Sequence, residues 1–292
     1  MTRPVRIGAV RYLNSKPLIF RLEEYAPWAE LRLDVPSRLA DDLAAGELDV
    51  ALIPSIEYFR QRRGQTSGAA LTFKPCAEAS ASQYAIVPGM AIAAHGPVLS
   101  VKLYCRVPVP EIRTVALDEG SRTSVALTKI LLDRWAGLRP ITRPLPLGMP
   151  AEETDADAVL VIGDRAIQPL ELGQVATFDL GEAWLRATGL PFVFAMWVAR
   201  RDIELVDVAA ALRQAKASGL ANVSEIATLE GPRLGLAIPD AIRYLTENIR
   251  FDFGPRELEG LELFYDSAVK LDLAPAGVPI VFWNEPDVAR VR

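Results

Sequence analysis

The sequence predicts an α/β protein with two lobes, and three observations support this fold class. Segments typical of strands and of helices alternate over residues 5–55 and again over residues 111–164. The strand-like segments 50–53 and 158–162 are apolar at every position, which is typical of a parallel sheet covered by helices. The length of 292 residues is also sufficient for about two domains.

The first alternation begins with a strand that leads into a helix. An apolar run that includes Ile7 and Val10 predicts the strand, and a helix is expected over residues 15–24. Ser15 is expected at the N-cap of this helix, because a serine hydroxyl accepts a free backbone N–H, and Pro17 is tolerated in the first turn. The strand therefore ends at the positive end of a helix.

Three more segments complete this alternation. Residues 31–35 alternate apolar and charged side chains, which predicts a strand. Ser37 is expected to cap a short amphipathic helix that ends before Gly46. The apolar strand at residues 49–53 follows and is ended by a proline and Ser55. The order is strand, helix, strand, helix, strand.

The second alternation has the same organisation. A polar turn at residues 118–124 follows its first strand, and a helix is expected from there to about Trp135. Gly163 and Asp164 close its last strand, much as Ser55 closes the strand at residues 49–53. The predicted strands are residues 112–117, 141–145 and 158–162.

Two extended passages, at about 84–107 and 190–201, are expected to join the lobes as paired hinge strands. Helices follow the second passage without further strands, so we expect them to pack back on the first lobe; they are predicted at about 203–219, 222–230, 236–250 and 255–271. This predicts a two-lobed binding-protein layout around a central cleft, where ligands bind in open α/β sheets. The predicted division is residues 1–88 plus 198–292 for lobe 1 and residues 89–197 for lobe 2.

Composition argues against several classes of partner. The net charge is −5 and no long basic run occurs, so nucleic acid is not expected as a partner. Cys76, Cys105 and the single His95 have no metal-type spacing, so no metal site is expected. No apolar stretch approaches the ~20 residues of a membrane span, and no signal-peptide pattern follows the first basic residues. We expect a cytoplasmic protein without a membrane partner.

The corner after the first strand is a candidate anion site. Unpaired backbone N–H groups and a positive helix end converge there, beside Tyr12, Asn14 and Ser15. The same residues also fit an ordinary strand-to-helix corner, and the local sequence leaves both interpretations open.

Seven blocks of the chain resemble the chorismate dehydratases of the menaquinone pathway, and the likeness runs from about residue 5 to 272. They are Gly8–Asn14, Gly46–Ser55, Gly96–Leu103, Val115–Asp118 with Ser121–Ser124, Gly163–Ala166, Asp179–Trp184 and Asn248–Tyr265. The chain departs from the family pattern at Ala94 and His95, and in the tail from Ala274.

The resemblance implies a fold similar to that of type 2 periplasmic binding proteins, used as a cytosolic enzyme without a cofactor. It implies removal of water from chorismate to give 3-[(1-carboxyvinyl)oxy]benzoate, the first committed step of the futalosine route to menaquinone. Chorismate is then the small-molecule partner. The oligomeric state is not predicted.

Chorismate carries two carboxylates, and three places in the chain are candidates to bind them. The helix start at Ser121, Arg122, Thr123 and Ser124 offers hydroxyls, backbone N–H groups and a guanidinium. Arg122 could instead pair with Asp118 or Glu119. The turn at Ser55 and the Asn14–Ser15 corner are candidates for the other carboxylate, and Gly163 and Asp164 are placed at the same cleft.

The base is expected to come from the substrate. An acidic side chain beside a dianion would repel it, and His95 is not in a block assigned to the cleft. We therefore expect the enolpyruvyl carboxylate to take the C3 proton while Asn14 fixes the pose. A hydroxyl of Ser80 or Ser82 is expected to assist departure of the C4 hydroxyl, although both serines also fit an ordinary polar loop.

Two other functions fit a fold of this kind. One is a solute-binding protein that captures a small anion without chemistry. The other is the sister enzyme that releases dihydroxynaphthoate from cyclic futalosine, for which we expect a histidine base in the cleft.

Overall fold

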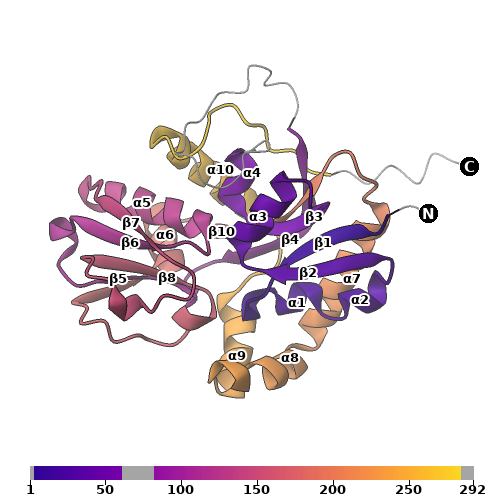
Figure 1. Ribbon diagram of the computed structural model, residues 1–292, viewed down its shortest axis with the longest axis horizontal. Coiled ribbons are helices and arrows are strands. Elements are labelled where there is room, and N and C mark those ends of the chain that lie inside the picture. The colour runs from indigo at the N-terminus through magenta and orange to yellow at the C-terminus, as the bar shows by residue number, and fades with distance from the viewer. Residues whose placement is uncertain (1–2, 61–81, 284–292) are drawn as a thin grey trace, which may run out of the picture.

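The structure, a computed structural model, describes residues 3–60 and 82–283. They form two lobes that lie side by side, each built on one five-stranded sheet with helices packed against it (Figure 1). The predicted two-lobed α/β fold is therefore confirmed.

The sheet of the first lobe is mixed. β1 pairs in parallel with β2 and β3, whereas β10 runs antiparallel to both β3 and β4. In spatial order the strands are β2 (Ala29–Asp34), β1 (Val5–Val10), β3 (Val50–Pro54), β10 (Phe192–Arg200) and β4 (Tyr84–Ala94). The two passages expected to connect the lobes thus contribute full strands to this sheet.

The sheet of the second lobe repeats the pattern. β6 is parallel to β7 and β8, and β5 is antiparallel to β8 and β9. In spatial order the strands are β7 (Ile141–Leu145), β6 (Thr114–Asp118), β8 (Ala158–Ile162), β5 (Val101–Cys105) and β9 (Ala176–Asp179). The predicted lobe boundaries, after residues 88 and 197, fall inside β4 and β10.

Helices pack against both sheets (Figure 1). Gly219 of α7 approaches the backbone of Pro17 in α1 so closely that a Cβ atom would lie 2.1 Å from the carbonyl oxygen. Helix α7 therefore packs against the first lobe. The helices are α1 (Lys16–Ile19), α2 (Leu22–Tyr25), α3 (Pro36–Ala44), α4 (Ser55–Arg60), α5 (Arg122–Ala136), α6 (Leu180–Thr188), α7 (Val206–Ala221), α8 (Val223–Glu230), α9 (Ile238–Arg243) and α10 (Pro255–Lys270).

The helix expected over residues 15–24 is broken. A 3-10 turn (η1, Leu13–Ser15) precedes α1, and Arg21 adopts a left-handed backbone with φ 54° between α1 and α2. Ser15 is at the N-cap of α1, as expected, but its hydroxyl does not accept a backbone N–H of the helix; it donates to the carbonyl oxygens of Val10 and Tyr12. The expected cap at Ser37 is wrong, since α3 begins at Pro36 and Ser37 lies in its first turn.

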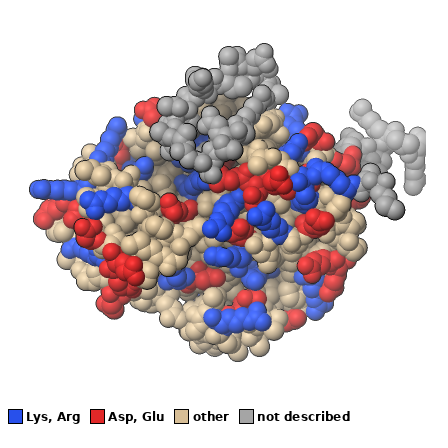
Figure 2. All heavy atoms as spheres, in the orientation of Figure 1, with Lys and Arg blue, Asp and Glu red and all other residues tan. Residues whose placement is uncertain are grey.

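One continuous set of buried apolar side chains extends through both lobes, from Ile7 and Leu52 in the first to Leu103 and Leu127 in the second. The lobes are therefore packed against each other. Within the described ranges, no helix is long and apolar enough to cross a membrane. Basic and acidic side chains are interspersed over the face shown in Figure 2.

Candidate active site

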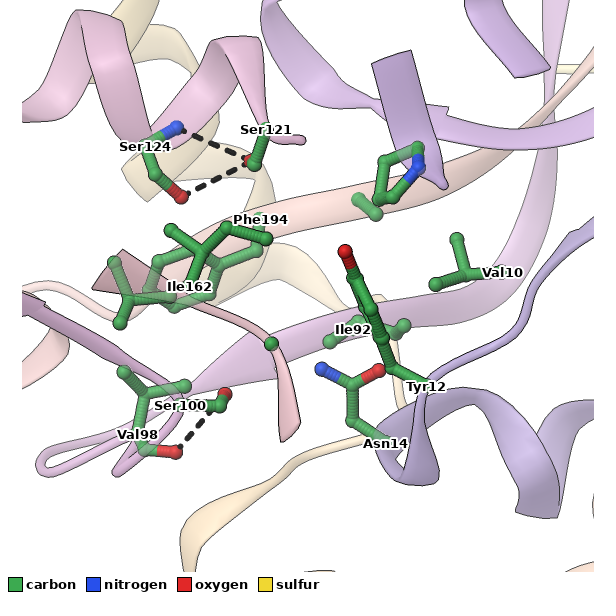
Figure 3. A pocket seen from close by; sticks show the side chains of 14 residues that line it. Val10, Tyr12, Asn14, Ile92, Val98, Ser100, Ser121, Ser124, Ile162 and Phe194 are labelled. Carbon is green, nitrogen blue, oxygen red and sulfur yellow. Dashed lines mark hydrogen bonds between the residues drawn. The ribbon is translucent and has the colours of Figure 1, made fainter. Parts of the chain in front are cut away.

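A small cavity lies between the two lobes (Figure 3). Its walls come from the ends of strands and the starts of helices in both sheets, which is where α/β proteins bind ligands. The first lobe contributes Val10, Tyr12, Asn14, Pro36, Ile92, Phe194 and Ala195; the second contributes Val98, Ser100, Val101, Ser121, Ser124, Ile162 and Gly163.

The polar groups of the cavity are neutral. Of the described residues that line it, none carries a charged side chain; the polar side chains belong to Tyr12, Asn14, Ser100, Ser121 and Ser124. An anion bound here would be held by hydrogen bonds and by the dipole of a helix, which needs no buried counter-charge.

The helix that supplies this dipole is α5. Ser121 is its N-cap, and the Ser121 hydroxyl oxygen accepts from the backbone N–H of Ser124 at 3.4 Å and from the Ser124 hydroxyl at 3.0 Å (Figure 3). Both hydroxyls lie on the cavity wall. The start of α5, which is expected to bind an anion, therefore lies at the cleft, with Ser121 and Ser124 on the cavity wall.

Tyr12 forms the opposite wall and packs on Gly163 of the second lobe. A Cβ atom at Gly163 would lie 2.8 Å from Cζ of Tyr12, and Gly163 has φ +75°, so glycine is required there. Burial raises the pKa of Tyr12 to about 12, with the Asp118 carboxylate acting in the same direction. The Tyr12 hydroxyl is thus a neutral hydrogen-bonding group at ordinary pH.

Asn14 presents an unsatisfied acceptor. Its Oδ1 atom is buried and has no hydrogen-bond partner among the described residues. Figure 3 shows its amide beside the Tyr12 ring, with the nitrogen pointing away from the ring toward the side where Ser100 lies. Since an unpaired buried polar atom costs about 1–3 kcal/mol, a ligand or water that donates to Asn14 is favoured.

Asp164 lies behind this wall and accepts a cross-lobe hydrogen bond. Its Oδ1 atom accepts from the backbone N–H of Leu13 at 2.9 Å, and burial raises its pKa to about 6. Asp164 is absent from the described cavity lining, so the structure places it as a support of the Asn14 turn. Its neighbour Gly163 does line the cavity.

Three other predicted binding residues lie outside the described cavity lining. Ser15 donates to the carbonyl of Val10. Ser55 donates to the carbonyl of Val193 at 2.7 Å and lies 3.3 Å from the Thr123 hydroxyl. Thr123 accepts from the backbone N–H of Ile56 at 3.2 Å. The Ser55 and Thr123 hydroxyls thus hold α4 against the start of α5.

Arg122 bridges the two lobes. Its guanidinium donates to both oxygens of Asp41 at 2.9 and 2.7 Å and to Glu57 at 3.1 Å. The alternative pairing with Asp118 or Glu119 is wrong, because Asp118 is bound by Arg165 instead. The chain turns Arg122 away from the cavity while its neighbours Ser121 and Ser124 face it.

The structure does not bring Ser82 to the cavity. Ser82 precedes β4 and its hydroxyl donates to the Tyr84 carbonyl at 2.9 Å, whereas Ile92 of the cavity lies near the other end of this strand. Ser80, the other hydroxyl proposed to assist the leaving group, lies outside the described residues. His95 pairs with Glu257 of α10 and is not part of the lining.

Of the described polar residues that line the cavity, Ser100 escaped the sequence analysis. It belongs to the block Gly96–Leu103, but nothing in that block distinguishes it from its neighbours. Within the described part of the chain, no group of three or more His, Cys, Asp or Glu residues could hold a metal ion.

Comparison with known proteins agrees with this architecture. A chorismate dehydratase from Thermus thermophilus is 32% identical over 297 residues, covering 95% of this chain and 99% of the relative. Protein AF1704 from Archaeoglobus fulgidus superimposes with a TM-score of 0.69 at 16% identity, covering 93% of this chain and 99% of its own.

The alkanesulfonate-binding protein SsuA from Xanthomonas axonopodis gives a TM-score of 0.60 at 16% identity, covering 95% of this chain and 96% of its own. This likeness shows the expected fold, that of periplasmic binding proteins of type 2. The sequence profile described as "Menaquinone biosynthesis" matches residues 5–67 and 75–270. This chain belongs to the menaquinone biosynthesis family.

Proposed function

We propose that this protein is a chorismate dehydratase, a lyase that converts chorismate to 3-[(1-carboxyvinyl)oxy]benzoate and water without a cofactor. The observation that carries the proposal is the neutral cavity between the lobes, in which the start of α5 faces Asn14. The 32% identity to a chorismate dehydratase over nearly the whole chain supports the same substrate.

The cavity offers two places for the two carboxylates of chorismate. The N-terminus of α5, with the hydroxyls of Ser121 and Ser124, suits one carboxylate. The amide of Asn14 suits the enolpyruvyl carboxylate, because the described residues that line the cavity include no cation that would bind this group more tightly and hold it away from the ring. Arg122 is engaged with Asp41 and Glu57 and is not part of this arrangement.

The reaction needs no strong base from the protein. The enolpyruvyl group is attached at C3, so its carboxylate can reach the C3 proton once Asn14 fixes the pose. The C3–H bond breaks, its electron pair forms the new ring double bond, and the C4–O bond breaks. The departing hydroxide takes up the proton as water, and formation of the aromatic ring drives the step.

The proposal is tested by mixing the purified protein with chorismate, following the aromatic product by ultraviolet absorbance and identifying it by mass. We expect turnover in the wild type and a loss of at least about a hundredfold in Asn14→Asp, since its carboxylate repels the substrate. Asn222→Ala is the matched control, because the Asn222 amide donates to its own helix at Ser218.

Saturable chorismate binding without product would instead favour a solute-binding protein. Nearly full activity in Asn14→Ala would refute the role of Asn14 while leaving the overall reaction in place. The first outcome tests the proposed reaction, and the second tests the role of Asn14 in it.

A further inference from the structure

A second cavity, of about 200 Å³, lies apart from the candidate active site, and no described residue lines both. One side is formed by α5, β7 and the connection between them in the second lobe, and the other by residues at the end of α10 and just after it. An apolar cavity of about 150 Å³ is large enough to hold benzene, so this cavity has room for a six-membered ring with one small polar group.

The walls of this second cavity combine basic side chains with apolar surface. Lys129 of α5, Arg139 and Thr142 are the polar residues of the described lining, and no acidic residue is among them. The described lining of the candidate active site, in contrast, carries no charge. The two cavities therefore suit different ligands. The apolar part of the second one consists of Leu138, Pro140, Leu271 and Leu273.

Lys129 has no partner for its positive charge. None of the described residues accepts a hydrogen bond from its ammonium group or forms an ion pair with it. The side chain is half-buried, and burial lowers the pKa of Lys129, with the nearby guanidinium of Arg60 acting in the same direction. Because a partly buried cation without a counter-charge is unfavourable, binding of an anion beside Lys129 is favoured.

The surroundings of Lys129 add to the positive charge. The guanidinium of Arg60 donates to the carbonyl of Leu273 at 3.0 Å, so a second cation lies beside the wall that Leu273 forms. Glu57 pairs with Arg60 at 2.8 Å and with Arg122 at 3.1 Å, so its single negative charge is already shared by two cations. Lys129 is left to a ligand.

We propose that this second cavity binds a small organic anion with an apolar body, an aromatic carboxylate, whose acidic group pairs with Lys129. Arg139 is the second cation available to that group: its pair with Asp133, at 3.1 Å, is largely exposed, and such pairs are weak enough to be shared with a ligand. The Thr142 hydroxyl is a further donor, and the leucine and proline side chains pack on the ring. The inference does not depend on the proposed reaction.

A ligand in this place contacts both lobes. Helix α10 packs against β10 and α4 of the first lobe, and Leu271 and Leu273 lie at its end, whereas Lys129 belongs to the second lobe. The complete cavity exists only in the folded protein, so the ligand should raise the melting temperature. This readout needs no substrate.

Benzoate is the probe, and its binding to the full chain is measured by titration calorimetry and by the melting temperature. We expect saturable binding and a higher melting temperature. Benzamide keeps the ring but has no charge, and acetate keeps the charge but has no ring. Each should bind at least about tenfold more weakly than benzoate, because each lacks one of the two interactions. Inorganic phosphate should not displace benzoate.

Lys129→Gln should weaken benzoate binding by about tenfold or more, because it removes the unpaired cation. Lys270→Gln is the matched control: it removes an exposed lysine next to Leu271 that is not in the described lining, and should leave the affinity unchanged. Asn14→Ala changes only the candidate active site and should also leave it unchanged. Chorismate turnover should stay close to wild type in both lysine variants.

The ligand comparison in the wild type holds even if a variant fails to fold. Equal affinity for benzoate and benzamide, or wild-type affinity in Lys129→Gln, would overturn the inference. Loss of benzoate binding in Asn14→Ala but not in Lys129→Gln would overturn it as well, by placing benzoate in the candidate active site. A protein that converts chorismate but does not bind benzoate contradicts this inference alone, and the reverse result contradicts the proposed reaction alone.

Discussion

The carboxylate of Asp164 in the second lobe accepts a hydrogen bond of 2.9 Å from the backbone N–H of Leu13 in the first. Leu13 directly precedes Asn14, so the position of the Asn14 amide depends on contact between the lobes. A second bond across the cleft joins the Ser37 N–H to the Gly120 carbonyl at 3.2 Å. The cavity wall around Asn14 is therefore held in place by contacts between the two lobes.

Asp164 should make stability depend on pH. Its pKa is about 6 in the folded protein against 3.8 for the free group, because burial disfavours the charged form. The folded state thus holds the proton more tightly. The resulting stabilisation is fully present below about pH 4 and is lost as the pH rises through about 6.

Asp164→Asn removes this dependence and keeps an oxygen that can accept from Leu13. The unfolding free energy of both proteins is measured in urea from pH 4 to pH 7. Relative to the wild type, the variant should become more stable by up to about 2–3 kcal/mol as the pH rises. Asp155→Asn, at an 87% exposed side chain, is the control and should follow the wild type. Parallel curves for Asp164→Asn and wild type would contradict the prediction.

Gly163→Ala should damage the cavity through Tyr12. The new methyl group would lie 2.8 Å from the Tyr12 ring, so the ring must move from its place on the cavity wall. We expect a loss of about 1–3 kcal/mol in unfolding free energy and at least about a tenfold loss in kcat/KM with chorismate. Urea unfolding and steady-state kinetics measure the two effects.

Gly173→Ala is the control for backbone strain alone. Gly173 has a similar φ of +68°, but nothing lies within 4 Å of a Cβ atom there. This variant should lose about 1 kcal/mol and keep its activity. Equal losses of activity in both variants would mean that the contact with Tyr12 is unimportant.

Arg122→Ala should weaken the contact between the lobes. The substitution removes the ion pair between Arg122 and the carboxylate of Glu57, whose side chain is only 5% exposed. The ion pair between Arg60 and Glu57, at 2.8 Å, is kept. We expect a loss of about 1–3 kcal/mol in urea unfolding. Arg139→Ala breaks an exposed pair with Asp133 and should cost less than about 1 kcal/mol.

Arg122→Ala also tests whether Arg122 supports the contact between the lobes or binds the substrate directly. Because Arg122 is not in the described cavity lining, its loss should change KM for chorismate less than Ser124→Ala does. A KM increase for Arg122→Ala that exceeds that of Ser124→Ala, with unchanged stability, would restore Arg122 as a ligand of the substrate carboxylate.

Ser124→Ala should weaken substrate binding with little effect on folding. The Ser124 hydroxyl lies on the cavity wall at the start of α5, while the N-cap acceptor Ser121 is kept. Loss of one hydrogen bond to an anion predicts an increase in KM of about tenfold. Ser267→Ala removes a hydroxyl that donates to Leu263 within α10 and should leave KM unchanged. An unchanged KM in Ser124→Ala would place the carboxylate elsewhere.

Strands were the most predictable elements. The segments predicted at residues 49–53, 112–117 and 158–162 coincide with β3, β6 and β8 within a residue or two, because strands buried on both faces are apolar throughout. The helix expected over residues 15–24 failed because Arg21 adopts a left-handed backbone, which its sequence does not signal.

Site residues were predictable where they follow a strand end or begin a helix. Tyr12, Asn14, Ser121, Ser124 and Gly163 line the cavity, and their roles in binding stay predictions. Arg122 and Thr123 were predicted with Ser121 and Ser124 as one group, although successive helix positions point in directions about 100° apart. Which of these directions meets the cleft depends on how α5 lies against the other lobe.

The sequence by itself determined the fold class, the two-lobed plan and the family, because these depend on local apolar patterns and on motifs in a characteristic order. Only the tertiary structure decided which polar side chains reach the cavity. Arg122 is directed to Asp41 and Glu57, and Asp164 to Leu13. Each of these relationships joins residues that are distant in the chain, and packing of the two lobes brings them together.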